Sequence, residues 1–260
     1  MMPTADGFVK RRGLPAPGSI PDVLDMFRAE VRFYREIAPV AGVRVPECFR
    51  ADDDADETLL VLEDLSAWLP GADPVVAAGV LAGMHQRWAG QADARWPWLR
   101  QVGAAADLVE ELYERTWPLL AARNELPRRV ADLGAHLVGR VCAAEAAVAE
   151  DGPITLVHGD ASLANMRTGP DGEVALLDWE DVSAAPGVLD LAWLLVSSVD
   201  PARWPEVIDA YGPAPGLGQV LPAVIVQGLL SLADTPAESA EAYGWIARLG
   251  QAALLLAAAS

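Results

Sequence analysis

The segment Thr155–Glu180, TLVHGDASLANMRTGPDGEVALLDWE, decides how the whole chain is interpreted. The apolar run Ile154–Val157 predicts a short buried strand. Farther along, Gly169-Pro170-Asp171-Gly172 is a strong turn signal, and Glu173–Leu177 predicts the returning strand of a hairpin. Polar residues stand at the ends of these strands. We therefore expect their side chains to meet in one place.

Three of these polar residues suit phosphoryl transfer from a metal-bound nucleotide. That reaction requires one carboxylate to orient the attacking hydroxyl, and oxygen ligands to hold Mg²⁺ against the phosphates. Asp160 can do the first. Asn165 follows it by five residues and Asp178 ends the hairpin, so both can supply the hard oxygen donors that Mg²⁺ prefers.

The motifs extend over a longer stretch of sequence. They are HGDxxxxN at His158–Asn165, LLDWED at Leu176–Asp181 and GVLDLA at Gly187–Ala192. Together they resemble the catalytic core of the aminoglycoside phosphotransferase and choline kinase group, which are small-molecule kinases. The resemblance implies an α+β, bilobal, protein-kinase-like fold with a small sheet-plus-helix N-lobe and a larger, mostly helical C-lobe.

The resemblance also implies a role for each residue of the motif. Asp160 would be the catalytic base, and Asn165 and Asp178 would be the Mg²⁺ ligands. His158 would support the loop structurally, and Asp190 would brace it through backbone hydrogen bonds. The plainer alternatives are that Asp160 is a helix cap, that Asp178 is a turn residue, and that Asp190 is an N-terminal carboxylate of the next helix.

The resemblance continues towards the N-terminus. Gly7–Arg11 predicts a strand that carries Lys10, the sole lysine of the chain. Glu30 lies in a segment, EVRFYRE, that is similar to a helix of the same group, and it would aim Lys10 at the nucleotide phosphates. Glu36 is the competing carboxylate. The alternative is that Lys10 is a surface residue of a basic N-terminal tail.

The segment Leu59–Leu65 resembles the family's strand into the hinge between the lobes. In such kinases backbone N–H and C=O groups of this segment bind adenine, so the resemblance implies that side-chain identity matters little. Glu63, Asp64 and Leu65 would be the nucleotide-binding residues. A strand that simply runs into a loop would have the same sequence.

One departure from the family concerns the cover of the phosphates. The family has two strands and a loop before the strand lysine, whereas only nine residues precede Lys10 here. The N-lobe is therefore expected to be truncated. The start codon could be misplaced, the chain could be truncated, or the protein could lack this cover.

The predicted domains are an N-lobe at 1–65, a hinge at 66–72 and a helical C-lobe at 73–260. Asp22–Ala38 predicts one amphipathic helix of the N-lobe, followed by strands at Val45–Arg50 and Thr58–Leu62. The C-lobe helices are predicted by their apolar periodicity and end signals. They are Asp73–Ala89, Ala104–Ala122, Pro127–Glu150, Gly187–Ser198, Pro205–Tyr211, Leu217–Ala233 and Glu238–Ala258.

Composition excludes several classes of function. The formal net charge of −18 opposes binding to nucleic acid or to anionic membranes. No apolar run is expected to reach the roughly 18 residues that span a bilayer, and the N-terminus lacks the apolar core of a signal peptide. Cys48 and Cys142 lack metal-site spacing and indicate free thiols in a reducing, cytoplasmic compartment.

We therefore expect an ATP- and Mg²⁺-dependent kinase that acts on a small-molecule hydroxyl. Trp179-Glu180 stands where protein kinases have Phe-Gly, and no long activation segment precedes Asp190. The acceptor could be an antibiotic, an amino alcohol or a natural-product intermediate. The alternatives are a non-catalytic kinase-fold binding protein, and an unrelated metal-dependent hydrolase that uses Asp160 and Asp178.

Overall fold

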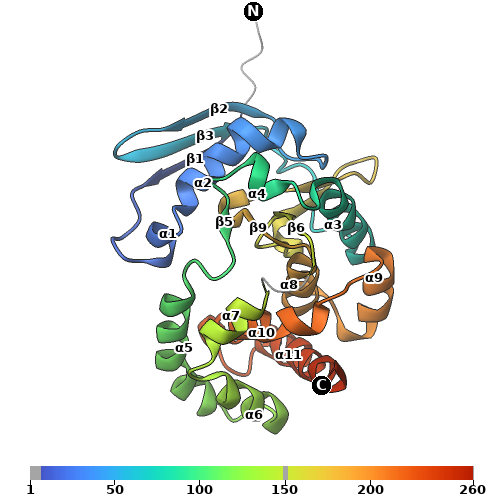
Figure 1. Ribbon diagram of the computed structural model, residues 1–260. Coiled ribbons are helices and arrows are strands. Elements are labelled where there is room, and N and C mark those ends of the chain that lie inside the picture. The colour runs from blue at the N-terminus through green and yellow to red at the C-terminus, as the bar shows by residue number, and fades with distance from the viewer. Residues whose placement is uncertain (1–6, 149–151, 260) are drawn as a thin grey trace, which may run out of the picture.

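The computed structural model describes residues 7–148 and 152–259. Its first part contains an antiparallel sheet in the order β1-β3-β2, at the top of Figure 1. The strands are β1 (Phe8–Gly13), β2 (Cys48–Asp53) and β3 (Glu57–Leu62). Lys10 lies near the middle of the edge strand β1 and pairs with Leu60 of the central strand β3. The predicted strand therefore exists and carries its lysine.

The single helix predicted over residues 22–38 is wrong. The chain forms α1 (Ile20–Val23) and α2 (Met26–Arg32), separated at Asp25, which has a left-handed backbone with φ 48°. Asp is one of the few residues that adopt this conformation readily. After α2 the chain continues as a π-helical turn, Phe33–Ile37. Helix α2 contacts β2 and β3, so it covers one face of the sheet.

The remainder of the described chain is mostly helical, with short strands between the helices (Figure 1). The helices are α3 (Pro74–Trp88), α4 (Ala92–Arg95), α5 (Ala106–Ala121), α6 (Arg128–Leu137), α7 (Val141–Val148), α8 (Val188–Ser198), α9 (Trp204–Tyr211), α10 (Leu217–Asp234) and α11 (Ala240–Ala259). Helix α3 begins where the sequence predicts. The Asp73 carboxylate accepts hydrogen bonds from the N–H groups of Val75 and Val76, as an N-cap does.

Two three-stranded sheets hold the HGD segment in place. One has the order β4-β7-β8, with β4 (Leu69–Pro70), β7 (Met166–Thr168) and β8 (Val174–Leu176). The other has the order β5-β9-β6, with β5 (Arg100–Gln101), β6 (Ile154–Val157) and β9 (Ser183–Pro186). The predicted hairpin is thus β7–β8, and β6 is the predicted strand before the HGD segment.

Two other helix predictions need correction. The helix expected over residues 127–150 is interrupted between α6 and α7, where Gly139 has φ 69°, and its last residues lie outside the described part of the chain. Helix α10 has 18 residues and a mean hydropathy of 1.4, so by length and composition it could cross a membrane. The expectation that no segment reaches this length is therefore wrong. Helix α10 contacts α5, α7, α8 and α11, and half of it is buried, as in the core helix of a globular fold.

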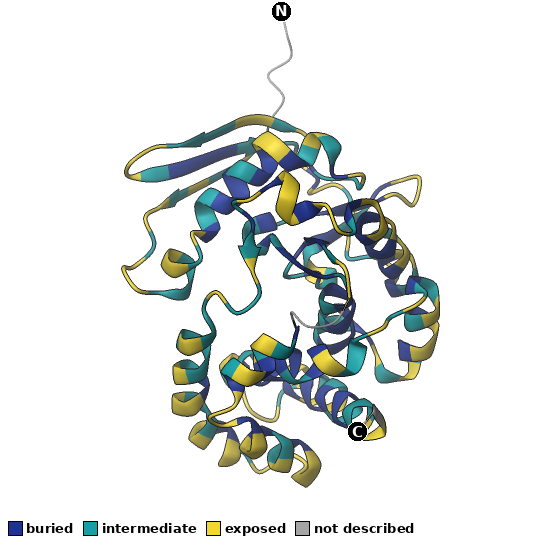
Figure 2. Cartoon of the chain, in the orientation of Figure 1, coloured by how far each residue is buried: buried dark blue, intermediate teal, exposed yellow. Residues whose placement is uncertain are grey.

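A continuous apolar core connects the sheet-bearing part with the helical part. Phe33, after α2, stacks on Trp179, next to Asp178, with ring centroids 3.9 Å apart and planes 9° apart. Both side chains are fully buried. Figure 2 shows buried segments gathered around α8 and the short strands, with exposed residues on the outer faces of α5 and α6. Helix α2 and the π-helical turn after it are therefore packed directly against the segment after the hairpin.

Candidate active site

The loop after β6 has a backbone conformation that only glycine suits. Gly159 has φ +87°, and a Cβ there would lie 2.2 Å from the carbonyl oxygen of Asp181. Buried Asp190, at the start of α8, accepts hydrogen bonds from the backbone N–H groups of His158 (2.7 Å) and Gly159 (2.9 Å). The expected brace between Asp190 and the loop is thus present in the structure.

Asp190 remains a strong acceptor because of its partners. Burial acts to raise the pKa of its carboxyl, but the hydrogen bond and charge of His85, together with the His158 contacts, outweigh burial and lower that pKa. His85 Nε2 lies 3.1 Å from Asp190, and His85 Nδ1 lies 2.9 Å from the Tyr211 hydroxyl. His85, on α3, is therefore buried and supports the loop through its contact with Asp190.

His158 is fully buried and lies between the loop and the hairpin. Its Nε2 is 2.8 Å from the carbonyl oxygen of Leu177, and its Nδ1 is 3.3 Å from the backbone N of Asp160. The Nε2–H therefore donates to Leu177, and Nδ1 accepts from Asp160. Its ring also contacts Trp179, with centroids 4.4 Å apart. These contacts join the HGD segment to the end of the hairpin.

The Asp160 carboxylate has a donor on each oxygen. Asn165 Nδ2 donates to Oδ2 at 2.7 Å, and the indole N–H of Trp193 donates to Oδ1 at 2.5 Å. Our sequence interpretation did not identify Trp193. Its position in the sequence could have identified it, because Trp193 follows Asp190 by three residues in α8 and residues at i and i+3 lie on the same helix face. One helix therefore contacts both the backbone and the acidic side chain of the loop.

A cleft of about 600 Å³ lies between the β1–β3–β2 sheet and the hairpin. It is large enough for a nucleotide-sized ligand. Its lining includes seven of the sequence-predicted site residues, which come from β1, α2, the segment after β3 and the hairpin region. They are Lys10, Glu30, Glu63, Asp64, Leu65, Asn165 and Asp178. Asp160 contacts this set through Asn165.

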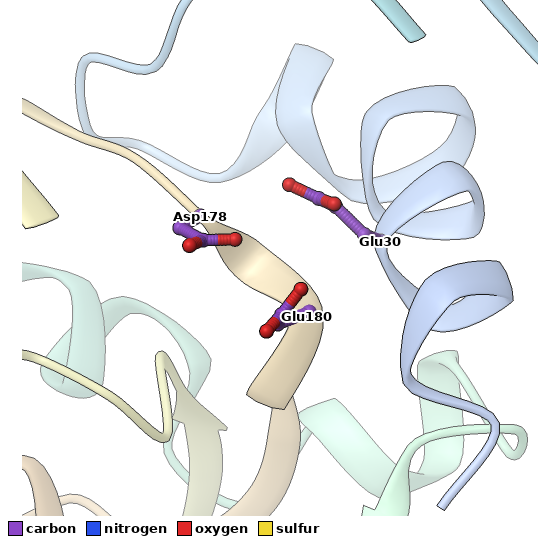
Figure 3. Close-up of side chains that lie close together, drawn as sticks. All are labelled: Glu30, Asp178 and Glu180. Atoms are coloured by element: carbon purple, nitrogen blue, oxygen red, sulfur yellow. The ribbon is translucent and has the colours of Figure 1, made fainter. Parts of the chain in front are cut away.

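Lys10 lies among three carboxylates at one end of the cleft. Its Nζ is 2.6 Å from Glu30, 2.6 Å from Asp178 and 3.5 Å from Glu180. Figure 3 shows these three acidic side chains turned towards one another, from α2 and from the segment after the hairpin. Glu36, the competing partner for Lys10, instead accepts a hydrogen bond from Trp98 at 2.8 Å. The structure thus pairs Lys10 with Glu30.

The charges in this cluster are strongly coupled. Burial acts to lower the pKa of Lys10, but Glu30 and Asp178 outweigh it and raise that pKa, so the ammonium stays charged. Burial raises the pKa of Glu30, whose side chain is 3% exposed, and Lys10 offsets this effect only in part. Lys10 is the cation that makes the buried carboxylate tolerable.

In the segment after β3, some backbone N–H and C=O groups are hydrogen-bonded within the protein and others are not. The Glu63 N–H donates to the Glu47 carbonyl, and the Leu65 carbonyl accepts from Trp68. The Glu63 side chain is bound by Arg44, and Asp64 caps the N–H of Ser66. Within residues 7–148 and 152–259, no protein group bonds the Glu63 carbonyl or the Leu65 N–H. These two groups remain available to a planar base.

A model of the phosphotransferase enzyme family matches residues 14–224, which include the HGD segment, the hairpin and Asp190. The chain belongs to the phosphotransferase enzyme family. The match begins after Lys10 and ends within α10. The family assignment that the sequence motifs suggested, and with it the prediction of a kinase-type enzyme, is thereby confirmed.

Solved structures of other phosphotransferases have a similar fold. Aminoglycoside phosphotransferase APH(3'')-Id from Streptomyces rimosus, solved with ADP and streptomycin, has a TM-score of 0.60 at 20% identity, with 86% of this chain and 88% of that chain covered. Choline kinase LicA from Streptococcus pneumoniae has a TM-score of 0.57 at 14% identity, covering 97% and 88%. An aminoglycoside phosphotransferase from Alicyclobacillus acidocaldarius has 0.54 at 16%, covering 96% and 85%.

At such low sequence identity, these structural similarities show the fold alone. They confirm the α+β, protein-kinase-like architecture expected from the sequence. No curated protein matches the chain. Of the motifs identified in the sequence, Asn165, Leu177 and Asp178 line the cleft. The roles of individual residues as catalytic base, metal ligands and nucleotide-binding residues remain predictions.

Proposed function

We propose that this phosphotransferase moves the γ-phosphoryl group of ATP to a hydroxyl of a small molecule, with Mg²⁺. The observation that carries the proposal is the contact between Asn165 and Asp160. Asn165 lines the nucleotide-sized cleft, and its amide nitrogen holds the Asp160 carboxylate at 2.7 Å. One residue therefore connects the cleft for the phosphoryl donor with the carboxylate that would receive the acceptor hydroxyl.

In the proposed reaction, the acceptor hydroxyl gives its proton to the Asp160 carboxylate as its oxygen bonds to the γ-phosphorus. The bond between that phosphorus and the bridging oxygen breaks, and ADP leaves with the bonding electron pair. Trp193 and Asn165 hold the two oxygens of Asp160 in a defined orientation. Positioning and electrostatic stabilisation are the main contributions that a protein makes to such a transfer.

The donor chemistry fits a magnesium ion. The Asn165 amide uses its nitrogen for Asp160, so its oxygen is the atom left for a cation, and Asp178 supplies a carboxylate to the same cleft. Glu30, Asp178 and Glu180 also lie close enough to hold a cation together, but Lys10 already contacts all three. We therefore assign Asn165 and Asp178 as ligands. Bound Mg²⁺ would neutralise charge on the phosphates.

We place adenine against the segment Glu63–Leu65. The Glu63 carbonyl accepts and the Leu65 N–H donates, whereas the Glu63 N–H is already used by Glu47. With adenine at this segment, we assign residues 1–65 to the nucleotide-binding lobe, 66–72 to the hinge and 73–260 to the lobe that carries the acceptor site.

The free Cys48 and Cys142 suit a reducing compartment such as the cytoplasm.

For the acceptor we propose an antibiotic, an amino alcohol or a natural-product intermediate. APH(3'')-Id was solved with streptomycin, and LicA is a choline kinase, and both compounds are cationic and carry hydroxyl groups. The net charge of −18 is compatible with a cationic acceptor.

The test is ADP release from Mg·ATP across a panel of aminoglycosides, macrolides, choline and neutral alcohols. We expect at least one compound to raise the rate above the level without acceptor. Binding of Mg·ATP without turnover of any compound would instead indicate a non-catalytic binding protein. Hydrolysis of phosphoesters without affinity for ATP would favour a metal-dependent hydrolase.

Replacement of Lys10 by alanine should impair both stability and nucleotide binding. The change leaves the buried Glu30 carboxylate without its cation, which costs up to about 3–5 kcal/mol. The double variant Lys10→Ala, Glu30→Gln should regain most of the lost Tm, because a neutral amide is cheaper to bury. It should not regain ATP affinity. Calorimetric affinity for ATP equal to wild type in the double variant would rule out a phosphate-binding role for Lys10.

Replacement of Trp193 by phenylalanine should lower kcat by about tenfold with little change in the KM for ATP. The ring is largely kept, but the donor to Asp160 Oδ1 is lost, and a hydrogen bond to a charged group contributes about 1.5–3 kcal/mol. Trp245→Phe is the matched control, because Trp245 contacts Trp193 but not Asp160. Equal kcat in the Trp193 and Trp245 variants would contradict the role of the indole N–H.

A further inference from the structure

Tyr34 carries a buried hydroxyl without a partner. It lies in the π-helical turn after α2, one turn beyond Glu30, and is 3% exposed. Within the described part of the chain no group bonds its hydroxyl. The Phe33 ring packs against the Tyr34 ring edge-on, with centroids 5.3 Å apart. A buried polar group without a partner is costly and calls for a physical explanation.

Tyr34 differs in this respect from the other buried tyrosines of the described chain. The Tyr113 hydroxyl donates to the carbonyl of Gly134 at 2.9 Å. The Tyr211 hydroxyl lies 2.9 Å from His85 Nδ1. In both, the hydroxyl has a hydrogen-bond partner within the fold. The acceptor of Tyr34 is therefore to be sought outside the fold.

The position of Tyr34 indicates where that acceptor would be. Tyr34 lines the cleft of about 600 Å³ together with Lys10 and Glu63. With Pro46 and Glu63 it also lines a second cavity of about 490 Å³. Tyr34 thus stands at the wall shared by the two cavities, on the side of the cleft that holds Glu63. That side is where we place the base of the nucleotide.

The hydroxyl of Tyr34 keeps its proton and can donate it in a hydrogen bond to such a ligand. Burial, followed by the charges of Glu30, Cys48 and Asp178, raises the pKa of Tyr34 well above its usual value. The phenol therefore keeps its proton.

We propose that Tyr34 is a nucleotide-binding residue, whose hydroxyl donates a hydrogen bond to a nitrogen or oxygen of the nucleoside in the cleft. The proposal rests on the proposed function, since it requires a nucleotide there. It adds a contact from the helix side of the cleft to those from Glu63 and Leu65. It also explains the unpartnered hydroxyl, which would be satisfied when the ligand is bound.

The test compares Tyr34→Phe with wild type and with Tyr113→Phe, a matched loss of a buried tyrosine hydroxyl. Calorimetry would measure the Kd of ADP with Mg²⁺ and of adenosine, and thermal unfolding would be followed without ligand. We expect Tyr34→Phe to weaken both ligands by about tenfold, which corresponds to about 1.4 kcal/mol. Its Tm without ligand should be unchanged or higher. Tyr113→Phe should lower the Tm and leave both Kd values unchanged.

The outcomes separate this inference from the proposed function. If wild type binds ADP and Tyr34→Phe binds both ligands equally well, the inference alone is overturned. A lower Tm of Tyr34→Phe with unchanged Kd values would also overturn it, because the hydroxyl would then have a structural partner. Weaker ADP binding with unchanged adenosine binding would overturn the assignment to the nucleoside. If wild type binds neither ligand, the proposed function fails, and this inference fails with it.

Discussion

Asp160→Asn should lower kcat by about 10²–10⁴-fold, the usual effect of losing a positioned proton acceptor. Asparagine has almost the same shape as aspartate. Its single amide oxygen can accept from Trp193, as Asp160 Oδ1 does at 2.5 Å, whereas its amide nitrogen cannot replace Oδ2 as the acceptor for Asn165, so one hydrogen bond is lost. It cannot take the proton of the acceptor hydroxyl. The variant should therefore fold and bind Mg·ATP nearly as wild type does while losing turnover.

Steady-state kinetics with a turned-over acceptor would measure this effect. Asp171→Asn is the matched control, because Asp171 is an exposed residue of the hairpin turn between β7 and β8. It should keep normal kcat. Near-normal turnover in Asp160→Asn would exclude Asp160 as the base. The helix-cap alternative would then be favoured only if the variant also lost stability.

Asp178→Ala should abolish Mg²⁺-dependent nucleotide binding, and Asn165→Ala should weaken it less. A carboxylate offers a full charge to a hard cation, whereas an amide oxygen offers only a dipole. Asp178 also has φ 60°, a left-handed conformation that alanine adopts with strain. Asparagine tolerates this conformation, so Asp178→Asn removes the charge without the backbone cost.

The two Asp178 variants together separate charge from strain. Both should lower the Mg²⁺-dependent part of ATP affinity in calorimetry, Asp178→Ala more than Asp178→Asn because asparagine keeps an amide oxygen, and only Asp178→Ala should also show a strain-related loss of Tm. Asp171→Ala, on the same hairpin, should bind Mg·ATP normally. Unaltered Mg·ATP affinity in Asp178→Asn would refute the assignment of Asp178 as a metal ligand. The Asp178 carboxylate would then serve as the ion-pair partner of Lys10, at 2.6 Å.

The HGD loop and its hairpin could be predicted because their determinants are local. The apolar strands, the Gly169–Gly172 turn and the spacing of the polar residues all lie within one short segment. Turn chemistry and strand alternation depend on neighbouring residues, which a sequence displays directly. The prediction of a single helix over residues 22–38 was wrong, although it also depended on local sequence. Its apolar periodicity continues through Asp25, and nothing in that pattern signals a left-handed residue there.

The sequence by itself determined the family, the order of the catalytic motifs and the residues that could form a site. Only the tertiary structure decided which of them meet. Lys10 and Asp178 are 168 positions apart and lie 2.6 Å from each other, and Trp193 reaches Asp160 from another helix. The packing of α2 and the turn after it on the sheet and on Trp179 places Glu30 against Lys10 and Glu36 against Trp98. The same packing buries the Tyr34 hydroxyl without a partner among the described residues. The physical reason is that these contacts depend on how buried surfaces fit together over long distances in the chain, and periodicity and spacing carry no information about that fit.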